Sequence, residues 1–153
     1  MPEASTDFPA PTEGFVVTNL VVANDIKKTS HFYSEQLGGK VVFQAPGGMT
    51  MIKLANGWVT VVEGGGGTPD KPDVTLAPPT DPNRFDAFMN LRVADVQAIY
   101  TEWSSRGVEF ITPPIDNGGF EMRCYVRDPD GRIIEVGQST GIMKNLDPDG
   151  AVA

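Results

Sequence analysis

The sequence predicts an α+β protein that consists of two tandem βαβββ modules. A strand pattern that leads through an aspartate into an amphipathic helix occurs twice, with Asp25 and Asp95 as the matching aspartates. A glycine opens a fourth strand in each copy, at Gly57 and at Gly131. The offset between the copies is similar at both landmarks, 70 positions between the aspartates and 74 between the glycines. Internal repetition of this kind indicates the fold class before any motif is considered.

The first module is predicted to cover residues 15–63, after a flexible N-terminal arm at residues 1–14. Asp25 caps a helix that ends at Gly38-Gly39, because aspartate accepts hydrogen bonds from free helix N–H groups and glycine suits a C-cap. Turns rich in Gly and Asn separate the strands that follow. The predicted strands are residues 15–22, 40–44, 49–54 and 58–62.

A Gly- and Pro-rich linker is predicted at residues 64–84, with a short added strand at Val74-Thr75-Leu76. The second module follows at residues 85–139, and a mobile tail covers residues 140–153. Asp95 caps a helix that stops at Gly107. The predicted strands are residues 86–93, 109–112, 120–127 and 133–138.

Composition limits the classes of partner. The formal net charge of −8 argues against nucleic acid and anionic membranes, because both are bound through basic patches. No apolar run approaches the ~20 residues that span a bilayer. The N-terminus lacks the basic and apolar regions of a secretory signal, and the single Cys124 cannot form an internal disulfide. We therefore expect a cytoplasmic protein.

Three segments carry a resemblance to a known family. Two of them run from a strand through the capping aspartate into the helix: Leu20-Val21-Val22-Ala23-Asn24-Asp25, and Leu91-Arg92-Val93-Ala94-Asp95-Val96. The third and most specific is Arg127-Asp128-Pro129-Asp130-Gly131-Arg132-Ile133-Ile134-Glu135. Together they resemble the vicinal oxygen chelate superfamily, which includes glyoxalase I, bleomycin-resistance proteins and extradiol dioxygenases. The resemblance covers roughly residues 15–138 and implies a curved mixed sheet around a cavity, with the helices outside.

The resemblance also implies a metal, held by a His in the first strand and a Glu in the fourth strand of each module. The matching positions, seven residues before each aspartate and four after each glycine, are Thr18, Phe88, Val61 and Glu135. Phe and Val have no donor atom, so we predict no metal and no other cofactor. Glu63 shares a face with Val61, but one or two carboxylates without a His hold a transition metal weakly. The only His, His31, lies in the first helix, outside the predicted cavity.

Strand alternation predicts a mostly apolar cavity with a few polar side chains, which suits a small organic ligand. Glu135 interrupts an apolar strand, where an unpaired carboxylate is unfavourable, and it is the candidate catalytic residue. Arg92 and Glu135 either meet the ligand, pair with each other, or lie at the strand ends in solvent. Alternation alone leaves open which of Tyr125 and Cys124 faces the cavity. The candidate ligand-binding residues are Thr18, Leu20, Val61, Glu63, Phe88, Asn90, Arg92 and Tyr125.

Two functions remain open. One is a metal-free binding protein, similar to the bleomycin-resistance group, that sequesters a small molecule. The other is an enzyme of isomerase or lyase type, in which Glu135 is the general acid or base. Small proteins of this superfamily often pair, so the resemblance also implies a homodimer.

Overall fold

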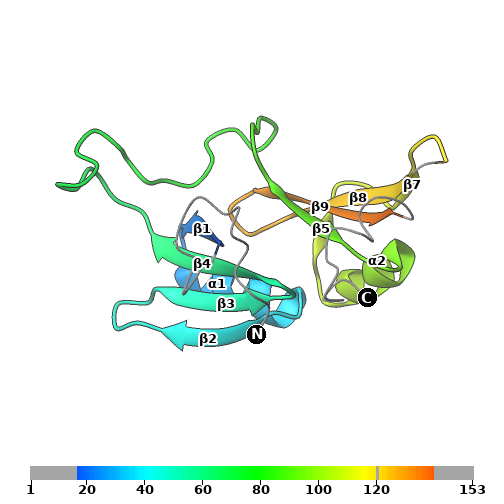
Figure 1. Ribbon diagram of the computed structural model, residues 1–153, viewed down its shortest axis with the longest axis horizontal. Helices are drawn as coiled ribbons and strands as arrows, with labels where there is room; N and C mark the ends of the chain where they lie inside the picture. Colours follow the sequence, from blue (N-terminus) through cyan, green and yellow to red (C-terminus); the bar gives the residue numbers. More distant parts are fainter. Residues whose placement is uncertain (1–16, 120, 140–153) are drawn as a thin grey trace, which may run out of the picture.

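The computed structural model describes residues 17–119 and 121–139. The predicted arm at residues 1–14 and the predicted tail at residues 140–153 lie outside the described residues. Within them the chain forms two units that are joined by a long connection (Figure 1).

The first unit is one βαβββ module. Its elements are β1 (Thr18–Ala23), α1 (Ile26–His31), the π-helical segment η1 (Phe32–Gln36), β2 (Lys40–Gln44), β3 (Thr50–Leu54) and β4 (Gly57–Glu63). The strand order is β1-β4-β3-β2, with β1 parallel to β4 and the other pairs antiparallel. Asp25 caps α1 as predicted, and its side chain accepts a hydrogen bond from the Lys28 N–H at 3.1 Å.

The second unit repeats the same order. Its elements are β5 (Met89–Arg92), α2 (Val96–Ser105), β6 (Glu109–Phe110), β7 (Ile115–Asp116), β8 (Glu121–Arg127) and β9 (Ile133–Ser139). The strand order is β5-β9-β8-β6, with β5 parallel to β9, and β7 pairs with β8. Asp95 caps α2 by accepting from the Ala98 N–H at 3.0 Å.

The predicted fold class, an α+β protein of two βαβββ modules, is therefore confirmed. The strands predicted at residues 86–93 and 109–112 are shorter in the structure, as β5 and β6, and three further local features differ from the sequence prediction. The first helix changes to π geometry, in which the Leu37 N–H donates to the Phe32 carbonyl at 2.9 Å, five residues back. The pair β7 with β8 was not predicted. Of Val74-Thr75-Leu76, only Leu76 pairs, as an isolated bridge to Gly65.

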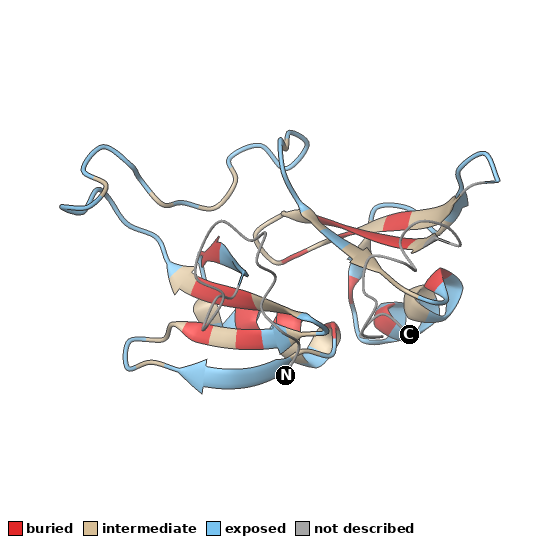
Figure 2. Ribbon diagram, viewed as in Figure 1, coloured by how far each residue is buried: buried red, intermediate tan, exposed pale blue. Residues whose placement is uncertain are grey.

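Each helix covers one face of its own sheet, and the buried residues gather between helix and sheet (Figure 2). In the first module Val59 and Val61 of β4 pack with Phe32 and Tyr33. In the second module the alternate residues of β8 and β9 are buried, together with Val96 and Trp103 of α2. These β8 and β9 residues are Cys124, Val126, Ile134 and Val136. The opposite face of each sheet is the one that its helix leaves uncovered, and we call it the open face.

The two modules meet where their helices end. The Gln36 amide donates to the Arg106 carbonyl at 2.8 Å, and the Arg106 guanidinium donates to the Gln36 carbonyl at 3.1 Å. These residues are 70 positions apart, the same offset as the capping aspartates. Equivalent positions thus contact each other, which locates an approximate twofold axis between the modules.

Gly39 is expected to tolerate no side chain. A Cβ at this position would lie 2.6 Å from the Tyr33 carbonyl oxygen and 2.7 Å from Cγ2 of Ile52. Because the first of these atoms is backbone, Gly39→Ala is expected to lower the free energy of unfolding by about 2 kcal/mol. Urea unfolding measures this, with Gly65→Ala as the control because no atom lies within 4 Å of a Cβ there. Equal losses in both variants would contradict the steric explanation.

No helix among the described residues is long and apolar enough to cross a membrane.

Candidate functional site

The open face of the second sheet carries most of the predicted site. The strand register pairs Asn90 with Glu135 and Glu135 with Tyr125, so these three side chains share one face. Arg92, two residues after Asn90, lies on the same face, and Phe88 packs edge-on against Tyr125 with ring centroids 5.9 Å apart. Cys124 faces α2 instead and is buried, so Tyr125 is the member of the pair that reaches this face.

Arg92 is the centre of a polar cluster on this face. Its Nη1 donates to Glu121 Oε1 at 2.5 Å, and its Nη2 donates to Glu135 Oε1. Its Nε donates to Asn90 Oδ1 at 2.8 Å. The Arg92 and Glu135 side chains are only 12% and 10% exposed, so both charges depend on this pairing.

Glu135 is engaged at both of its oxygens. Oε1 accepts from Arg92, and Oε2 accepts from the Tyr125 hydroxyl at 3.1 Å. Burial and the hydrogen bond to Glu135 raise the pKa of Tyr125, so its hydroxyl remains a donor at neutral pH. The sequence left open whether Arg92 and Glu135 pair with each other, and in the structure they do.

Gly137 makes room for the guanidinium. It pairs with Arg92 across β5 and β9, and a Cβ at this position would lie 2.7 Å from Arg92 Cζ and 2.8 Å from Nη2. The guanidinium therefore lies directly over the glycine. Any side chain at position 137 would push Arg92 away from the two carboxylates.

Glu121 is a site residue that the sequence analysis missed. It lies at the start of β8 and reaches Arg92 across the sheet, and Arg123 Nη1 lies 3.9 Å from its second oxygen. Strand alternation could have identified it, because Glu121 lies four residues before Tyr125 in the same strand and so faces the same side of the sheet. The cluster thus contains two guanidinium groups and two carboxylates.

In the first module the predicted placement of Val61 and Glu63 is wrong. Val61 pairs with Val21, has no exposed surface and belongs to the core under α1. Glu63 pairs with Ala23 on the same side, where it lines a hollow of about 700 Å³ beside α1. Exposed His31 lines the same hollow, away from the open face, as expected. The open face of this sheet carries Thr18 and Leu20, paired with Trp58 and Thr60 of β4.

The error has a physical cause in the length of two turns. Gly131 lies inside a wide turn, with φ 89°, and the last strand begins two residues later at Ile133. Gly57 is already a strand residue that pairs with Leu54. Matching the two glycines therefore shifts the register by one residue, which moves a side chain to the other face. Thr60, not Val61, is the position equivalent to Glu135.

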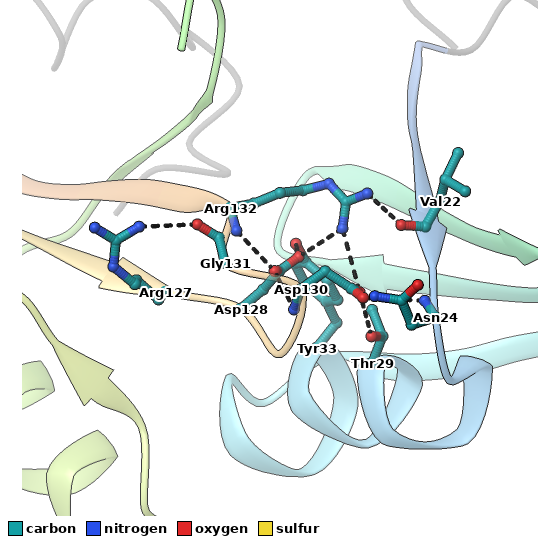
Figure 3. A network of polar contacts seen from close by, with 9 residues as sticks. All are labelled: Val22, Asn24, Thr29, Tyr33, Arg127, Asp128, Asp130, Gly131 and Arg132. Carbon is teal, nitrogen blue, oxygen red and sulfur yellow. Dashed lines mark hydrogen bonds and ion pairs between the residues drawn. The ribbon is translucent and has the colours of Figure 1, made fainter. Parts of the chain in front are cut away.

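The turn that leads into β9 fastens the site to the first module (Figure 3). Asp130 accepts from the Asn24 N–H at 3.0 Å and from the Thr29 hydroxyl at 2.8 Å. The Arg132 guanidinium donates to the Val22 carbonyl at the end of β1. We call Asp128, Asp130 and Arg132 the clasp.

Asp128 holds the clasp together from inside. Its buried carboxylate accepts from the Tyr33 hydroxyl at 2.8 Å and from Arg132 Nη1 at 3.1 Å. It also accepts from the backbone N–H groups of Asp130 at 2.9 Å and Arg132 at 3.0 Å. Burial, followed by the Asp128 charge, raises the pKa of Tyr33, which therefore stays a hydrogen-bond donor. Glu135, three residues after Arg132, is thus placed by a turn bonded to α1.

Comparison with known proteins identifies the family. The family model described as Glyoxalase/Bleomycin resistance protein/Dioxygenase superfamily matches residues 15–136. The chain belongs to this superfamily. No curated protein matches it.

Solved structures of this superfamily share the fold. A glyoxalase/bleomycin resistance protein/dioxygenase from Nocardioides superposes with a TM-score of 0.66 at 17% identity, covering 90% of this chain and 92% of its own. An antibiotic-binding protein from Streptomyces sp. CB03234 gives 0.59 at 22% identity, with coverages of 82% and 96%. A genomically encoded fosfomycin resistance protein from Listeria monocytogenes gives 0.60 at 15% identity, with coverages of 82% and 93%. At these identities the likeness shows the fold alone.

The metal that the superfamily resemblance implies does not fit the donors of this chain. Of the four corresponding positions, Thr18, Thr60, Phe88 and Glu135, only the last is a carboxylate, and each of its oxygens already accepts a hydrogen bond, from Arg92 and from Tyr125. Across residues 17–119 and 121–139, no three His, Cys, Asp or Glu side chains lie close enough to hold a metal ion together.

The Arg92 cluster predicts a specific acid sensitivity. The hydrogen bond from Arg92 lowers the pKa of Glu121 below its ordinary 4.5. A carboxyl whose pKa is lowered by folding contributes stability that is complete above the unfolded pKa, and this is lost as pH falls through the folded pKa. Urea unfolding from pH 7 to about pH 3 is therefore expected to show a steeper loss in the wild type than in Glu121→Gln. Identical pH profiles would contradict this assignment.

Proposed function

We propose that this superfamily member binds a small organic molecule, without a metal ion, on the open face of its second sheet. The observation that carries the proposal is the aromatic pair of Phe88 and Tyr125 beside the ion pair of Arg92 and Glu135. Phe88 is 44% exposed, so a large apolar ring is available for contact. Aromatic surface next to a few oriented polar groups is typical of small-molecule sites.

The cluster also indicates what the ligand carries. A guanidinium has five N–H donors, and three of those of Arg92 are used by Asn90, Glu121 and Glu135. Within the described part of the chain, two N–H groups are left for a ligand. We therefore expect a flat apolar body that contacts Phe88 and an acceptor oxygen that reaches Arg92. Structural neighbours named for antibiotic binding and fosfomycin resistance support binding of this general kind.

Binding is favoured over general acid–base catalysis, in which Glu135 would carry a proton to or from the substrate. Both Glu135 oxygens already accept hydrogen bonds, from Arg92 and from Tyr125. A general base needs a free lone pair directed at the substrate proton. A catalytic Glu135 would have to reach the substrate with the one lone pair left on each oxygen, from a side chain that is only 10% exposed.

The experiment is a thermal-shift screen of aromatic compounds with and without an acceptor oxygen, in buffer that contains EDTA. Compounds with the oxygen are expected to predominate among those that raise the melting temperature. Titration calorimetry is then expected to show about tenfold weaker binding to Phe88→Ala, from the loss of aromatic contact. Thr101→Ala on α2, far from this face and exposed, is the matched control.

Two outcomes would contradict the proposal. One is that no compound binds without added metal. The other is that Phe88→Ala and Thr101→Ala bind the compounds equally well. Chemical conversion of a bound compound, abolished by Glu135→Gln, would instead establish the enzymatic alternative.

A cytoplasmic homodimer is the proposed state of the protein. Apolar side chains on the two edge strands of the first sheet are well exposed, at 54% for Leu20 of β1 and 51% for Phe43 of β2. Exposed apolar groups of this size favour association. Light scattering at about 100 µM is expected to give twice the monomer mass, well above the dissociation constant of a stable dimer. A monomer mass at that concentration would exclude it.

A further inference from the structure

Three oxygen-bearing side chains from three strands surround the Arg92 guanidinium on the second sheet. They are Asn90 of β5, Glu121 of β8 and Glu135 of β9. Their oxygens contact three different nitrogens of Arg92. The guanidinium therefore lies between the three oxygens.

These oxygens are the donors that hard divalent cations bind. Carboxylates and amide carbonyls are the usual ligands of Ca²⁺ and Mn²⁺. Two carboxylates that face one another also need a positive charge between them, because like charges at close range oppose ionisation. Arg92 supplies that positive charge: its guanidinium pairs with both Glu121 and Glu135, and Nη1 lies 2.5 Å from Glu121 Oε1.

We propose that Arg92 is a built-in cation that holds the oxygens of Asn90, Glu121 and Glu135 together as a bound divalent metal ion would. The idea rests on the same site as the proposed function, but it concerns the protein's own residues and needs no organic ligand. We therefore expect the oxygens of Asn90, Glu121 and Glu135 to bind a divalent cation once Arg92 is removed. A chain that lacks this arginine is expected to gain a divalent-cation site.

Gly137 supports this role. The guanidinium fits over it so closely that even a methyl group would displace the charge. Burial alone would lower the pKa of Arg92, but its contacts with Glu121 and Glu135 raise the pKa overall, so the charge is permanent. A permanent side-chain charge is present in every folded molecule, whereas a metal ion must first bind from solution.

The test is the melting temperature of Arg92→Ala with and without about 5 mM MnCl₂. Mn²⁺ is expected to raise the melting temperature of Arg92→Ala by about 5 °C and that of the wild type by less than about 1 °C. If Arg92→Ala does not fold by itself, Mn²⁺ is expected to restore its far-ultraviolet circular dichroism. Titration calorimetry with MnCl₂ is expected to show one site in the variant.

Two control variants make the result specific. Arg92→Lys keeps a positive charge and is expected to show no response to Mn²⁺. The double variant Arg92→Ala/Glu135→Gln loses one carboxylate and is expected to lose the response. The proposal is overturned if Arg92→Ala gains no Mn²⁺ response, or if the double variant responds as strongly. Because no organic compound is used, failure here is separate from failure of the small-molecule site.

Discussion

Asp128→Ala is expected to lower the free energy of unfolding by about 4 kcal/mol, the largest effect of any single substitution considered for this chain. The Asp128 side chain has no exposed surface and accepts four hydrogen bonds. Its removal leaves the Tyr33 hydroxyl and two backbone N–H groups without their acceptor. It also removes the carboxylate that pairs with Arg132.

Urea unfolding measures this loss, and Asp116→Ala is the matched control. Asp116 also accepts a backbone hydrogen bond, from the Gly119 N–H at 2.8 Å, but it is exposed. We expect the control to change the free energy of unfolding by less than about 1 kcal/mol. Asp128→Asn keeps an acceptor oxygen without the charge, so an intermediate loss is expected. Equal losses for Asp128→Ala and Asp116→Ala would show that the buried hydrogen bonds of Asp128 do not stabilise the clasp.

Arg92→Leu is expected to lower the free energy of unfolding by about 3 kcal/mol. The substitution leaves the carboxylates of Glu121 and Glu135 beside each other without their shared cation. The cost thus comes mainly from unpaired charge and not from lost packing.

Charge removal on the other side tests this explanation. Arg92→Leu combined with Glu121→Gln and Glu135→Gln is expected to recover about half of the loss, since neutral amides need no cation. Urea unfolding of the wild type, the single variant and the triple variant provides the comparison. A triple variant that is less stable than Arg92→Leu would show that the carboxylates are favourable without the arginine.

Much of the fold was predictable because local chemistry and repetition pointed the same way. Asp25 and Asp95 cap their helices as aspartates at the end of a strand commonly do. The alternation of β8 and β9 correctly predicted a face with Glu135. The π-helical segment was not predictable, because Phe32–Gln36 contains no residue type that distinguishes π from α geometry.

The candidate site was predictable in the second module and not in the first. In β5 the short distance to the capping aspartate indicates which alternate residues face away from the helix. Asn90 and Arg92 were therefore placed on the correct face. In β4 the assignment of alternate residues to the two faces depended on the length of the preceding turn, which the sequence does not show. Val61 was therefore placed on the wrong face. Contacts between modules were also not predictable. Nothing near Asp130 in the sequence indicates that Thr29 is its partner.

The clasp has a consequence for the order in which the molecule folds. Among residues 17–119 and 121–139, every strand pair joins two strands of the same module, whereas the clasp contacts Asn24–Asp130 and Val22–Arg132 span 106 and 110 positions. Contacts that close such long loops are entropically costly, and they form once both partners are already structured. Interactions absent from the transition state change the unfolding rate more than the folding rate. The clasp is therefore expected to slow unfolding of the joined modules more than it speeds their folding.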